Sequence, residues 1–215
     1  MAGNPWIQAP ETDADAPDEG VVDAPIAPPV DLVPPVAPQS GVTLPKAADR
    51  FPRRVLTTHI EQQTRLWWMG VHGGAGETTL EQLLEGSRAA SHAWPMDSRH
   101  DGLPPRVVLV ARTNARGLRA AQLAATEWAS GDVPVHLEGL VLVADAPGRL
   151  PKPLKQFARL VAGGVPHVWE LPWVEDWRVG EPVSEDTAPK AVTQLLEHLR
   201  SACLVPTISS NHHPS

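Results

Sequence analysis

The sequence predicts an α/β fold in which a mostly parallel sheet is covered by helices. Three observations predict it: short apolar runs alternate with stretches of helical periodicity, the runs are apolar on both faces, and a glycine cluster follows the first run. Strands that are buried on both faces are typical of parallel sheets between helices. The chain has 215 residues, of which 42% are hydrophobic, and this suffices for one such domain with terminal extensions.

Strands and helices are expected in alternation along the chain. Apolar runs predict buried strands at residues 66–71, 107–111, 140–144 and 168–171. Apolar residues at helical spacing predict helices at 78–84, 117–128, 153–161 and 188–202. An irregular connection is expected over 86–105, which has no sustained period, and 53–65 is expected to be a transition with at most a short helix.

The two ends of the chain differ in composition from its middle. Residues 1–45 are rich in Ala, Pro, Asp and Val and contain no Lys or Arg. Such a segment cannot bury enough apolar surface to offset its conformational entropy. We expect a disordered acidic arm over 1–55, a folded domain over 56–203 and a disordered tail over 204–215. The arm is expected to be a solubilising extension, and a docking peptide with the apolar anchors Ile26, Val30, Leu32 and Val33 is the alternative.

Charge and cysteine content limit the classes of function. The formal net charge of -7 argues against a large basic surface, so no direct binding of nucleic acid is expected. The single cysteine, Cys203, excludes an intrachain disulfide and a multi-thiolate metal site, and it suits a reducing cytoplasmic location. No run approaches the ~20 apolar residues of a transmembrane helix, so no direct membrane insertion is expected.

A glycine-rich segment between the first strand and the first helix is the main candidate site. Its residues are Gly70, His72, Gly73, Gly74, Ala75, Gly76, Glu77, Thr78 and Thr79. The spacing fits a Walker A loop, in which backbone N–H groups surround a phosphate chain, a lysine pairs with the β- and γ-phosphates and a threonine holds Mg²⁺. Here Glu77 occupies the lysine position. Thr78 is a metal ligand only if a Mg²⁺-nucleotide binds.

Glu77 is expected to oppose nucleotide binding. Two unit charges ~4 Å apart interact by about 4 kcal/mol at an effective dielectric near 20, so replacing an ammonium by a carboxylate changes the interaction by several kcal/mol. At ~1.4 kcal/mol per factor of ten, the affinity is expected to fall by orders of magnitude. The carboxylate is also expected to accept hydrogen bonds from the free N–H groups at the start of the following helix.

Residues 72–79 resemble the ParA/MinD loop Lys-Gly-Gly-x-Gly-Lys-Thr-[Thr/Ser], with both lysines replaced. Residues 107–113, followed by 117–122, are similar to that family's strand VVVVT and the helix after it. Residues 165–172, with Trp177 and 180–183, are similar to its segment IPVLGVIPxDxxVxxAxxxGxPV. The resemblance covers most of 66–202, weakly outside these motifs. It implies a reduced fold of the P-loop NTPase type.

The resemblance also bears on assembly and catalysis. In that family the first lysine reaches across a nucleotide-sandwich dimer, so His72 argues against ATP-driven dimerisation, while a homodimer of another kind stays open. Residues 140–148 resemble a Walker B strand, but their chain order favours the base-contacting strand, with Ala144 and Asp145 at its end. Residues 86–105 then replace the family's switch region. Asp97 and Asp101 are expected to be solvated loop residues.

Three tryptophans, Trp169, Trp173 and Trp177, recur at intervals of four residues at and after the last strand. Pro172 prevents one continuous helix through them. Tryptophan is enriched at interaction hot spots but also buries a large area, so contact and core roles both stay open. Contact is favoured for Trp173, because it follows the strand end, where open α/β sheets place their sites.

The sequence favours a non-catalytic adaptor or regulatory protein over an enzyme. The resemblance implies a protein partner, such as an ATPase of a partition, conjugation or secretion machine, and no cofactor is expected. The alternative is a divergent switch protein that binds ATP with Mg²⁺ through the glycine loop, with Lys152 or Lys155 supplying the charge. A protein that binds DNA directly is a third class, which the charge balance opposes.

Overall fold

The computed structural model describes residues 37, 41–97 and 103–204. The expectations for residues 1–36 and 38–40 of the arm, which include its four apolar anchors, lie outside these ranges. Asp101 and residues 205–215 of the expected tail also lie outside them.

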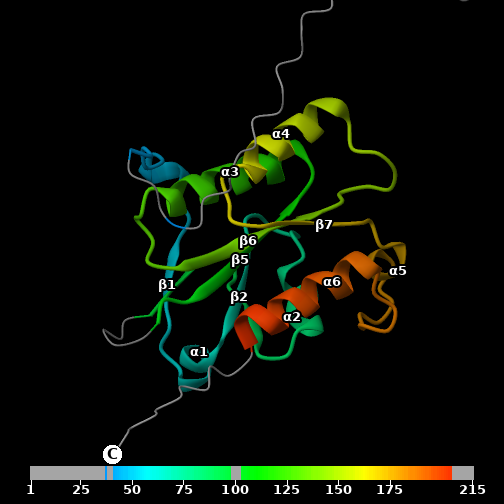
Figure 1. Ribbon diagram of the computed structural model, residues 1–215, viewed down its shortest axis with the longest axis horizontal. Helices are drawn as coiled ribbons and strands as arrows, with labels where there is room; N and C mark the ends of the chain where they lie inside the picture. The colour runs from blue at the N-terminus through cyan, green and yellow to red at the C-terminus, as the bar shows by residue number, and fades with distance from the viewer. Residues whose placement is uncertain (1–36, 38–40, 98–102, 205–215) are drawn as a thin grey trace, which may run out of the picture. The chain divides into compact units, whose positions relative to one another are not determined.

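Five parallel strands form the central sheet, in the order β3-β2-β5-β6-β7 (Figure 1). They are β2 (Leu66–Gly70), β3 (Ser87–Ala89), β5 (Arg106–Arg112), β6 (His136–Val143) and β7 (Val168–Leu171). Four of them are the strands predicted from apolar runs, and β6 begins four residues before its predicted start. The α/β architecture with a mostly parallel sheet is therefore confirmed.

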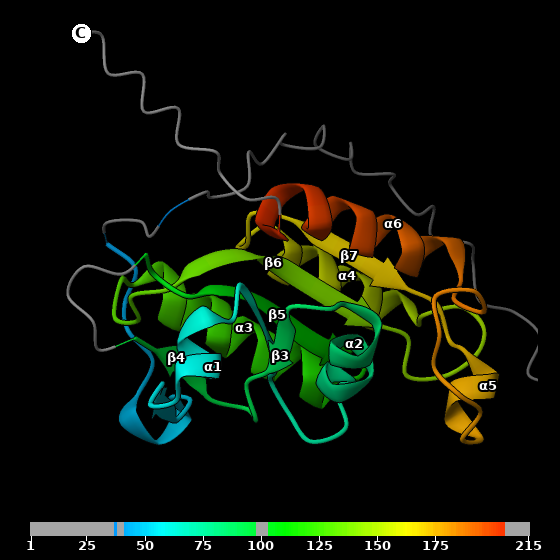
Figure 2. The ribbon, with the colours of Figure 1, turned by 90° about the horizontal axis from the view of Figure 1, so that it is seen from below.

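Helices cover both faces of this sheet, as Figures 1 and 2 show. The helices α3 (Ala115–Ala129) and α4 (Lys152–Ala162) pack on one face, and α2 (Glu77–Leu83) and α6 (Lys190–Leu199) pack on the other. These are the four predicted helices, with ends that differ by a few residues. The short helix α5 (Glu175–Arg178) joins β7 to α6, and a short π-helix, Arg200–Leu204, follows α6.

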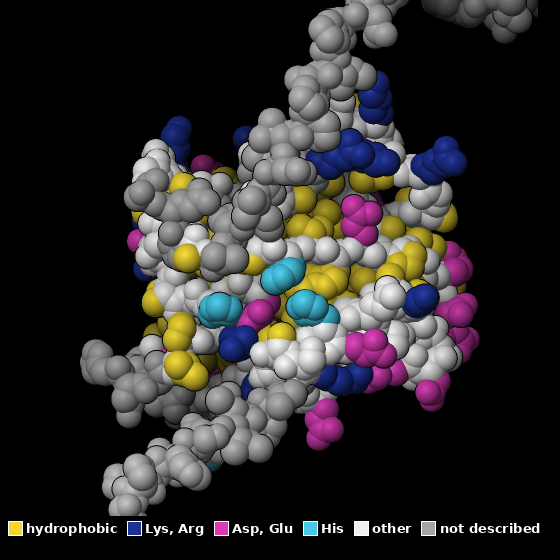
Figure 3. Space-filling view, in the orientation of Figure 1, with side chains coloured by type: hydrophobic (Ala, Val, Ile, Leu, Met, Phe, Trp, Pro, Cys, Tyr) yellow, Lys and Arg dark blue, Asp and Glu magenta, His cyan; other side chains and the backbone are white. Residues whose placement is uncertain are grey.

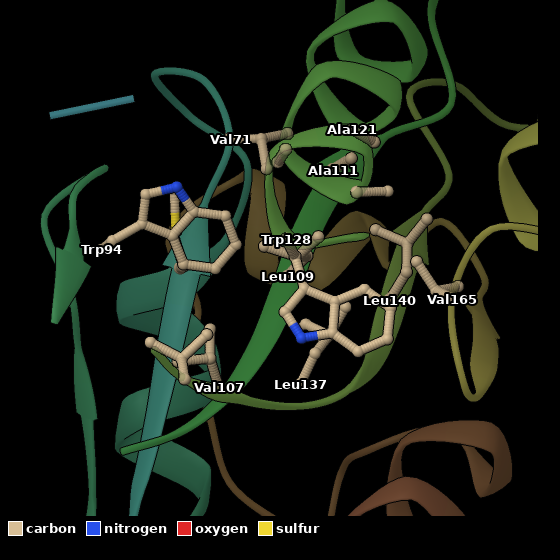
Figure 4. Close-up of a cluster of buried hydrophobic side chains, with 14 of the residues drawn as sticks. Val71, Trp94, Val107, Leu109, Ala111, Ala121, Trp128, Leu137, Leu140 and Val165 are labelled. Atoms are coloured by element: carbon tan, nitrogen blue, oxygen red, sulfur yellow. The ribbon is translucent and has the colours of Figure 1, made fainter. Parts of the chain in front are cut away.

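The core divides into two layers because each face of the sheet is apolar. On the α3/α4 face, Trp94 and Trp128 lie against branched side chains of β5 and β6, and both tryptophans are at most 1% exposed (Figure 4). On the other face, the apolar side of α6 packs on the sheet through Val192, Leu195 and Leu199. Full burial of such side chains contributes about 1.5–3 kcal/mol each, so the sheet and its helices form one unit.

A second, two-stranded sheet overturns the expectations of an irregular connection over 86–105 and of a transition without strands over 53–65. The strand β4 (Trp94–Met96) lies within 86–105, which was expected to be irregular and which also contains β3. It pairs in parallel with β1 (Arg53–Val55), and α1 (His59–Gln63) follows β1. Strands of three residues are too short to show a period, and their pairing partners lie far along the chain, so the pattern of residues did not reveal them.

The expected boundary of the arm at residue 55 is also wrong. The 3₁₀-helix Ala47–Asp49 and β1 both precede residue 56. The Phe51 N–H donates to the Glu127 carboxylate over 3.0 Å, and Arg53 forms an ion pair with Asp132. Residues 47–55 are thus attached to α3 and to the connection that follows it.

No helix within the described ranges is both long and apolar enough to cross a membrane.

Candidate functional site at the glycine loop

The glycine loop, residues 71–76, lies at the carboxyl ends of the parallel strands, between β2 and α2. The chain passes from β2 to β3 on one side and later to β5 on the other, so the strand order reverses between β2 and β5. Open α/β sheets bind their ligands at such a point. Gly74 and Gly76 have φ values of +75° and +112°, which side-chain-bearing residues rarely adopt. The loop therefore has the position and the backbone of a ligand-binding turn.

Glu77, at the lysine position, points away from the mouth of the loop. Its side chain is buried, and its Oε2 accepts a hydrogen bond from the Gly70 N–H over 2.7 Å. Its Oε1 lies 3.3 Å from the His92 Nδ1, which is also 2.7 Å from the Gly70 carbonyl oxygen. Because both neighbours of Nδ1 are acceptors, Nδ1 carries the proton. Glu77 and His92 together satisfy both backbone groups of Gly70.

The reason for this arrangement is the short length of β3. The pairing of β3 with β2 ends at Ala89 and Trp68, and the last bond on that side joins the Ala90 N–H to the Trp68 carbonyl. Gly70 would otherwise have a buried N–H and C=O without partners, at a cost of about 1–3 kcal/mol for each group. Glu77 and His92 supply the missing donors and acceptors at the end of β2.

This geometry corrects the expectation that Glu77 accepts hydrogen bonds from the start of α2. Its recorded partners are Gly70, on the preceding strand, and His92, in the β3–β4 connection. An added Cβ on Gly70 would lie 3.0 Å from the Glu77 Cδ, so the missing side chain at Gly70 allows this approach. Ser91 and His92 have φ values of +56° and +59°, a conformation that is uncommon for residues other than glycine. This backbone places the His92 ring against Glu77.

His72 joins the loop to β5. Its Nε2 accepts a hydrogen bond from the Arg112 N–H over 3.0 Å, so its Nδ1 carries the proton and donates to the Gly73 carbonyl, also over 3.0 Å. Gly117, in the first turn of α3, makes room for this contact. A Cβ there would lie 2.2 Å from the Arg112 carbonyl oxygen and 2.9 Å from the His72 Nε2. His72 thus fixes the loop within its own chain.

Three arginines surround the mouth of the loop. Arg112, Arg116 and Arg178 line a cavity of about 500 Å³ together with His72 and Gly74. Arg112 donates from Nε to the Gly74 carbonyl over 3.2 Å and from a terminal nitrogen to the Ala144 carbonyl over 2.9 Å. Arg178 lies over the Trp173 ring, 5.8 Å from its centroid. The cavity is therefore bordered by cationic side chains that belong to three separate elements.

Among the residues that the structure describes, Asp145 contributes the only carboxylate to the lining of this cavity, and it accepts a hydrogen bond from the Asn114 side chain over 3.0 Å. Burial lowers the pKa of Arg112, the positive charge of Arg178 lowers it further, and Asp145 opposes both effects. Glu77 lines neither this cavity nor the one beside it. The mouth of the loop thus carries an excess of positive charge that an anion would balance.

A second cavity of about 280 Å³ adjoins the first and shares Gly74, Arg112, Trp173 and Arg178 with it. Thr78, Thr79 and Trp177 also line it. The structure therefore brings together the loop, its two threonines and two of the three singled-out tryptophans. Trp169 lies elsewhere, on β7, where its ring contacts those of His167 and His198 at centroid distances of 5.7 and 5.5 Å.

Neither Lys152 nor Lys155, which the alternative hypothesis offered as a source of compensating charge, lines these cavities. Both belong to α4, and Lys155 borders a separate hollow beside β7. Asp145 lies at the end of β6, which β5 separates from the loop-bearing β2. Asp97 lines a different cavity near α1. Among the described residues, no cluster of three or more His, Cys, Asp or Glu side chains is arranged to hold a metal ion.

Four residues of the site were not predicted from the sequence: His92, Arg112, Arg116 and Arg178. A signal was available for Arg112 and Arg116, because they lie at the end of a predicted strand and just before a predicted helix, where parallel sheets gather side chains. His92 and Arg178 gave no such signal. They belong to short segments that only the folded chain brings to the loop.

Residues 64–196 match the family model DUF6668, which is described as a family of unknown function. The chain belongs to the DUF6668 family. The DUF6668 match spans all five strands of the central sheet and the glycine loop, but β1 lies outside it. No curated protein and no solved structure matches the chain. The DUF6668 match gives no support to membership of the ParA/MinD family, which stays a resemblance of motifs.

Proposed function

We propose that this DUF6668 protein is a non-catalytic adaptor or regulatory partner of another protein, with a degenerate glycine loop of the P-loop type. The observation that carries the proposal is the position of Glu77, whose buried carboxylate is hydrogen-bonded to the Gly70 N–H over 2.7 Å. A working loop needs a cation in that position for the β- and γ-phosphates. Here the position supports the strand end below the loop.

The chain keeps too few groups for phosphoryl transfer. Such catalysis depends on a lysine and Mg²⁺ that neutralise the charge developing on the phosphates. Of the lysine and the threonine that this chemistry needs, only the threonine, Thr78, is kept, and it lies on the wall of the smaller cavity. The proposal therefore includes no nucleotide hydrolysis and no resident cofactor. The single cysteine is in keeping with a cytoplasmic location.

The class of partner follows from the resemblance of residues 72–79 to the ParA/MinD loop. It is an ATPase of a partition, conjugation or secretion machine. Pull-down with the full chain, and with a chain that lacks residues 1–45, is expected to retain such an ATPase. Retention by the full chain alone would assign the contact to those residues, and retention by both would assign it to the rest of the chain. Failure of both to retain any ATPase would contradict the adaptor role.

Calorimetric titration of the full chain with Mg²⁺-ATP and Mg²⁺-GTP tests the loss of nucleotide binding. No heat of binding is expected in the micromolar range for the wild type. Glu77→Lys introduces the missing charge, and Glu77→Gln is the matched control that removes the carboxylate charge without adding a cation. Micromolar affinity of the wild type for either nucleotide would overturn the proposal.

A second candidate is a nucleotide-binding switch, and the arginines at the mouth of the loop favour it. Arg116 and Arg178 belong to different helices and line one cavity beside the loop glycines. They are in place to pair with phosphate oxygens, for which the planar guanidinium is well suited. This candidate predicts measurable ATP affinity that Arg116→Ala and Arg178→Ala each reduce, while Arg88→Ala, on the edge strand β3 and outside the lining of both loop cavities, leaves it unchanged.

A further inference from the structure

A groove runs along the edge strand β7, beside α4. It consists of two adjoining hollows of about 390 and 320 Å³, which share Arg159 and Ala162. We call it the α4–β7 groove; Arg149 lies in the hollow at one end and His167 in the hollow at the other. None of its lining residues also lines the two loop cavities, so the groove is separate from the candidate site.

The groove joins an apolar floor to a basic rim. Leu142, Leu150 and Ala158 contribute apolar surface, and Arg149, Lys155 and Arg159 border it. Residues 146–169 contain four Lys and Arg residues and no Asp or Glu. Figure 3 shows Lys and Arg side chains gathered over α4 next to a yellow apolar area. In the described part of the chain, Glu170 is the only acidic residue in the lining, so this lining carries a net positive charge.

One wall of the groove is a strand edge with backbone groups that the sheet does not use. The carbonyls of His167 and Leu171 accept hydrogen bonds from Leu140 and Ala144, toward the neighbouring β6. Because backbone groups alternate in direction along a strand, those of Val168 and Glu170 point away from β6. Within the described ranges, no strand pairs with this side of β7. An added strand is the usual partner of such an edge.

We propose that the α4–β7 groove binds an extended acidic peptide segment of a partner protein, which adds to the sheet beside β7. This surface rests on the proposed adaptor function and assigns to it a place of contact. Backbone hydrogen bonds to Val168 and Glu170 hold the peptide, apolar side chains enter the floor, and carboxylates meet the basic rim. A second copy of this chain fits less well, because two such grooves would place like charges against each other.

The charge of the rim also suits a nucleic acid, but two features favour a peptide. The floor is apolar, and the free strand edge offers donors and acceptors in the spacing of a β-strand, which a phosphate backbone does not match.

The test uses the full chain and a fluorescent peptide of about ten residues that alternates valine and glutamate, with binding followed by anisotropy at about 0.1 M salt. The acidic peptide is expected to bind, and its lysine counterpart is not. Lys155→Glu combined with Arg159→Glu is expected to raise the dissociation constant about fivefold or more. Arg88→Glu combined with Lys190→Glu makes the same change of charge at exposed positions elsewhere and is expected to have little effect.

Two further probes separate strand addition from attraction of charge alone. The same peptide with alternate backbone nitrogens methylated is expected to lose most of its affinity, and an oligothymidylate of equal charge is expected to bind more weakly than the acidic peptide. The proposal is overturned if the methylated peptide or the oligothymidylate binds as well as the parent peptide, if both pairs of charge reversals weaken binding equally, or if the acidic peptide does not bind. Such a result leaves the adaptor function standing, because the nucleotide titration and the pull-down test that function separately.

Discussion

At the residue scale, Glu77 shows how a buried carboxylate after the glycine loop supports the strand beneath it. The position that follows the loop glycines lies close to the end of β2, so its side chain can reach either the mouth of the loop or the strand beneath it. A carboxylate is an acceptor, and the group without a partner at the strand end is the N–H of Gly70. Glu77 therefore turns inward, where a lysine could not serve that N–H.

We expect Glu77→Ala to lower the free energy of unfolding by about 1–3 kcal/mol, because the buried Gly70 N–H loses its acceptor. Glu77→Gln keeps an acceptor oxygen and is expected to cost less. Urea denaturation of both variants measures the difference. An alanine variant as stable as the wild type would show that the buried hydrogen bond contributes nothing.

The contact of His72 with Arg112 depends on the absence of a side chain at Gly117. Gly117→Ala is expected to lower the free energy of unfolding by about 2 kcal/mol or more, since its Cβ would lie 2.2 Å from the Arg112 carbonyl. Gly73→Ala is the matched control in the same site, because an added Cβ there meets nothing within 4 Å. Thermal unfolding compares the two. Equal losses would contradict the close approach at Gly117.

Cys203 is expected to be a poor nucleophile. Burial, assisted by the nearby Glu138 carboxylate, raises its pKa from 9.0 to about 11, although Arg106 opposes the shift. Since the neutral thiol is favoured in the folded state, its contribution to stability is present below about pH 9 and is lost as the pH rises toward 11. Alkylation by iodoacetamide at pH 9 is expected to be much slower in the folded chain than in urea. Equal rates would contradict this burial.

At the scale of elements, the small β1–β4 sheet shows which interactions attach a short segment to the body. Surface ion pairs join Arg50 and Arg53 to Asp132, whereas Trp94 of β4 is fully buried in the core. Exposed pairs contribute little because water screens them, and burial of a tryptophan contributes much more. The attachment therefore depends on β4 more than on the charged residues around β1.

This difference can be measured with two variants. Trp94→Ala is expected to lower the free energy of unfolding by about 3–5 kcal/mol, and Asp132→Ala by about 1 kcal/mol or less. Hydrogen exchange of the Leu56 amide, which donates to the Met96 carbonyl over 2.9 Å, reports on the same sheet. Faster exchange in the Asp132→Ala variant than in the Trp94→Ala variant would show that the ion pairs, and not the burial of Trp94, hold the small sheet in place.

At the scale of the whole molecule, charge is divided unevenly along the chain. Residues 1–45 contain seven acidic residues and no Lys or Arg, so they account for the whole formal net charge of -7. The remainder carries equal numbers of acidic and basic residues and all nine histidines. Such a balance gives little electrostatic repulsion between copies near neutral pH.

Removal of residues 1–45 is expected to raise the isoelectric point from about 5.7 to near neutrality and to lower solubility at pH 7. Isoelectric focusing and turbidity measurements check both effects. An unchanged isoelectric point would show that basic residues in the remainder are not titrating normally.

Patterns in the amino-acid sequence were enough to predict the alternation of strands and helices, the parallel sheet and the position of the glycine loop. Those properties follow from local apolar runs and helical spacing, which are properties of neighbouring residues. The folded chain was needed to see that Glu77 turns toward Gly70, that His92 completes the end of β2 and that Arg112, Arg116 and Arg178 gather at the loop. Glu77 lies only seven residues from Gly70, whereas His92 lies 22 residues from Gly70 and Arg112 lies 38 residues from Gly74. All these contacts depend on which strands lie side by side, which no local pattern encodes.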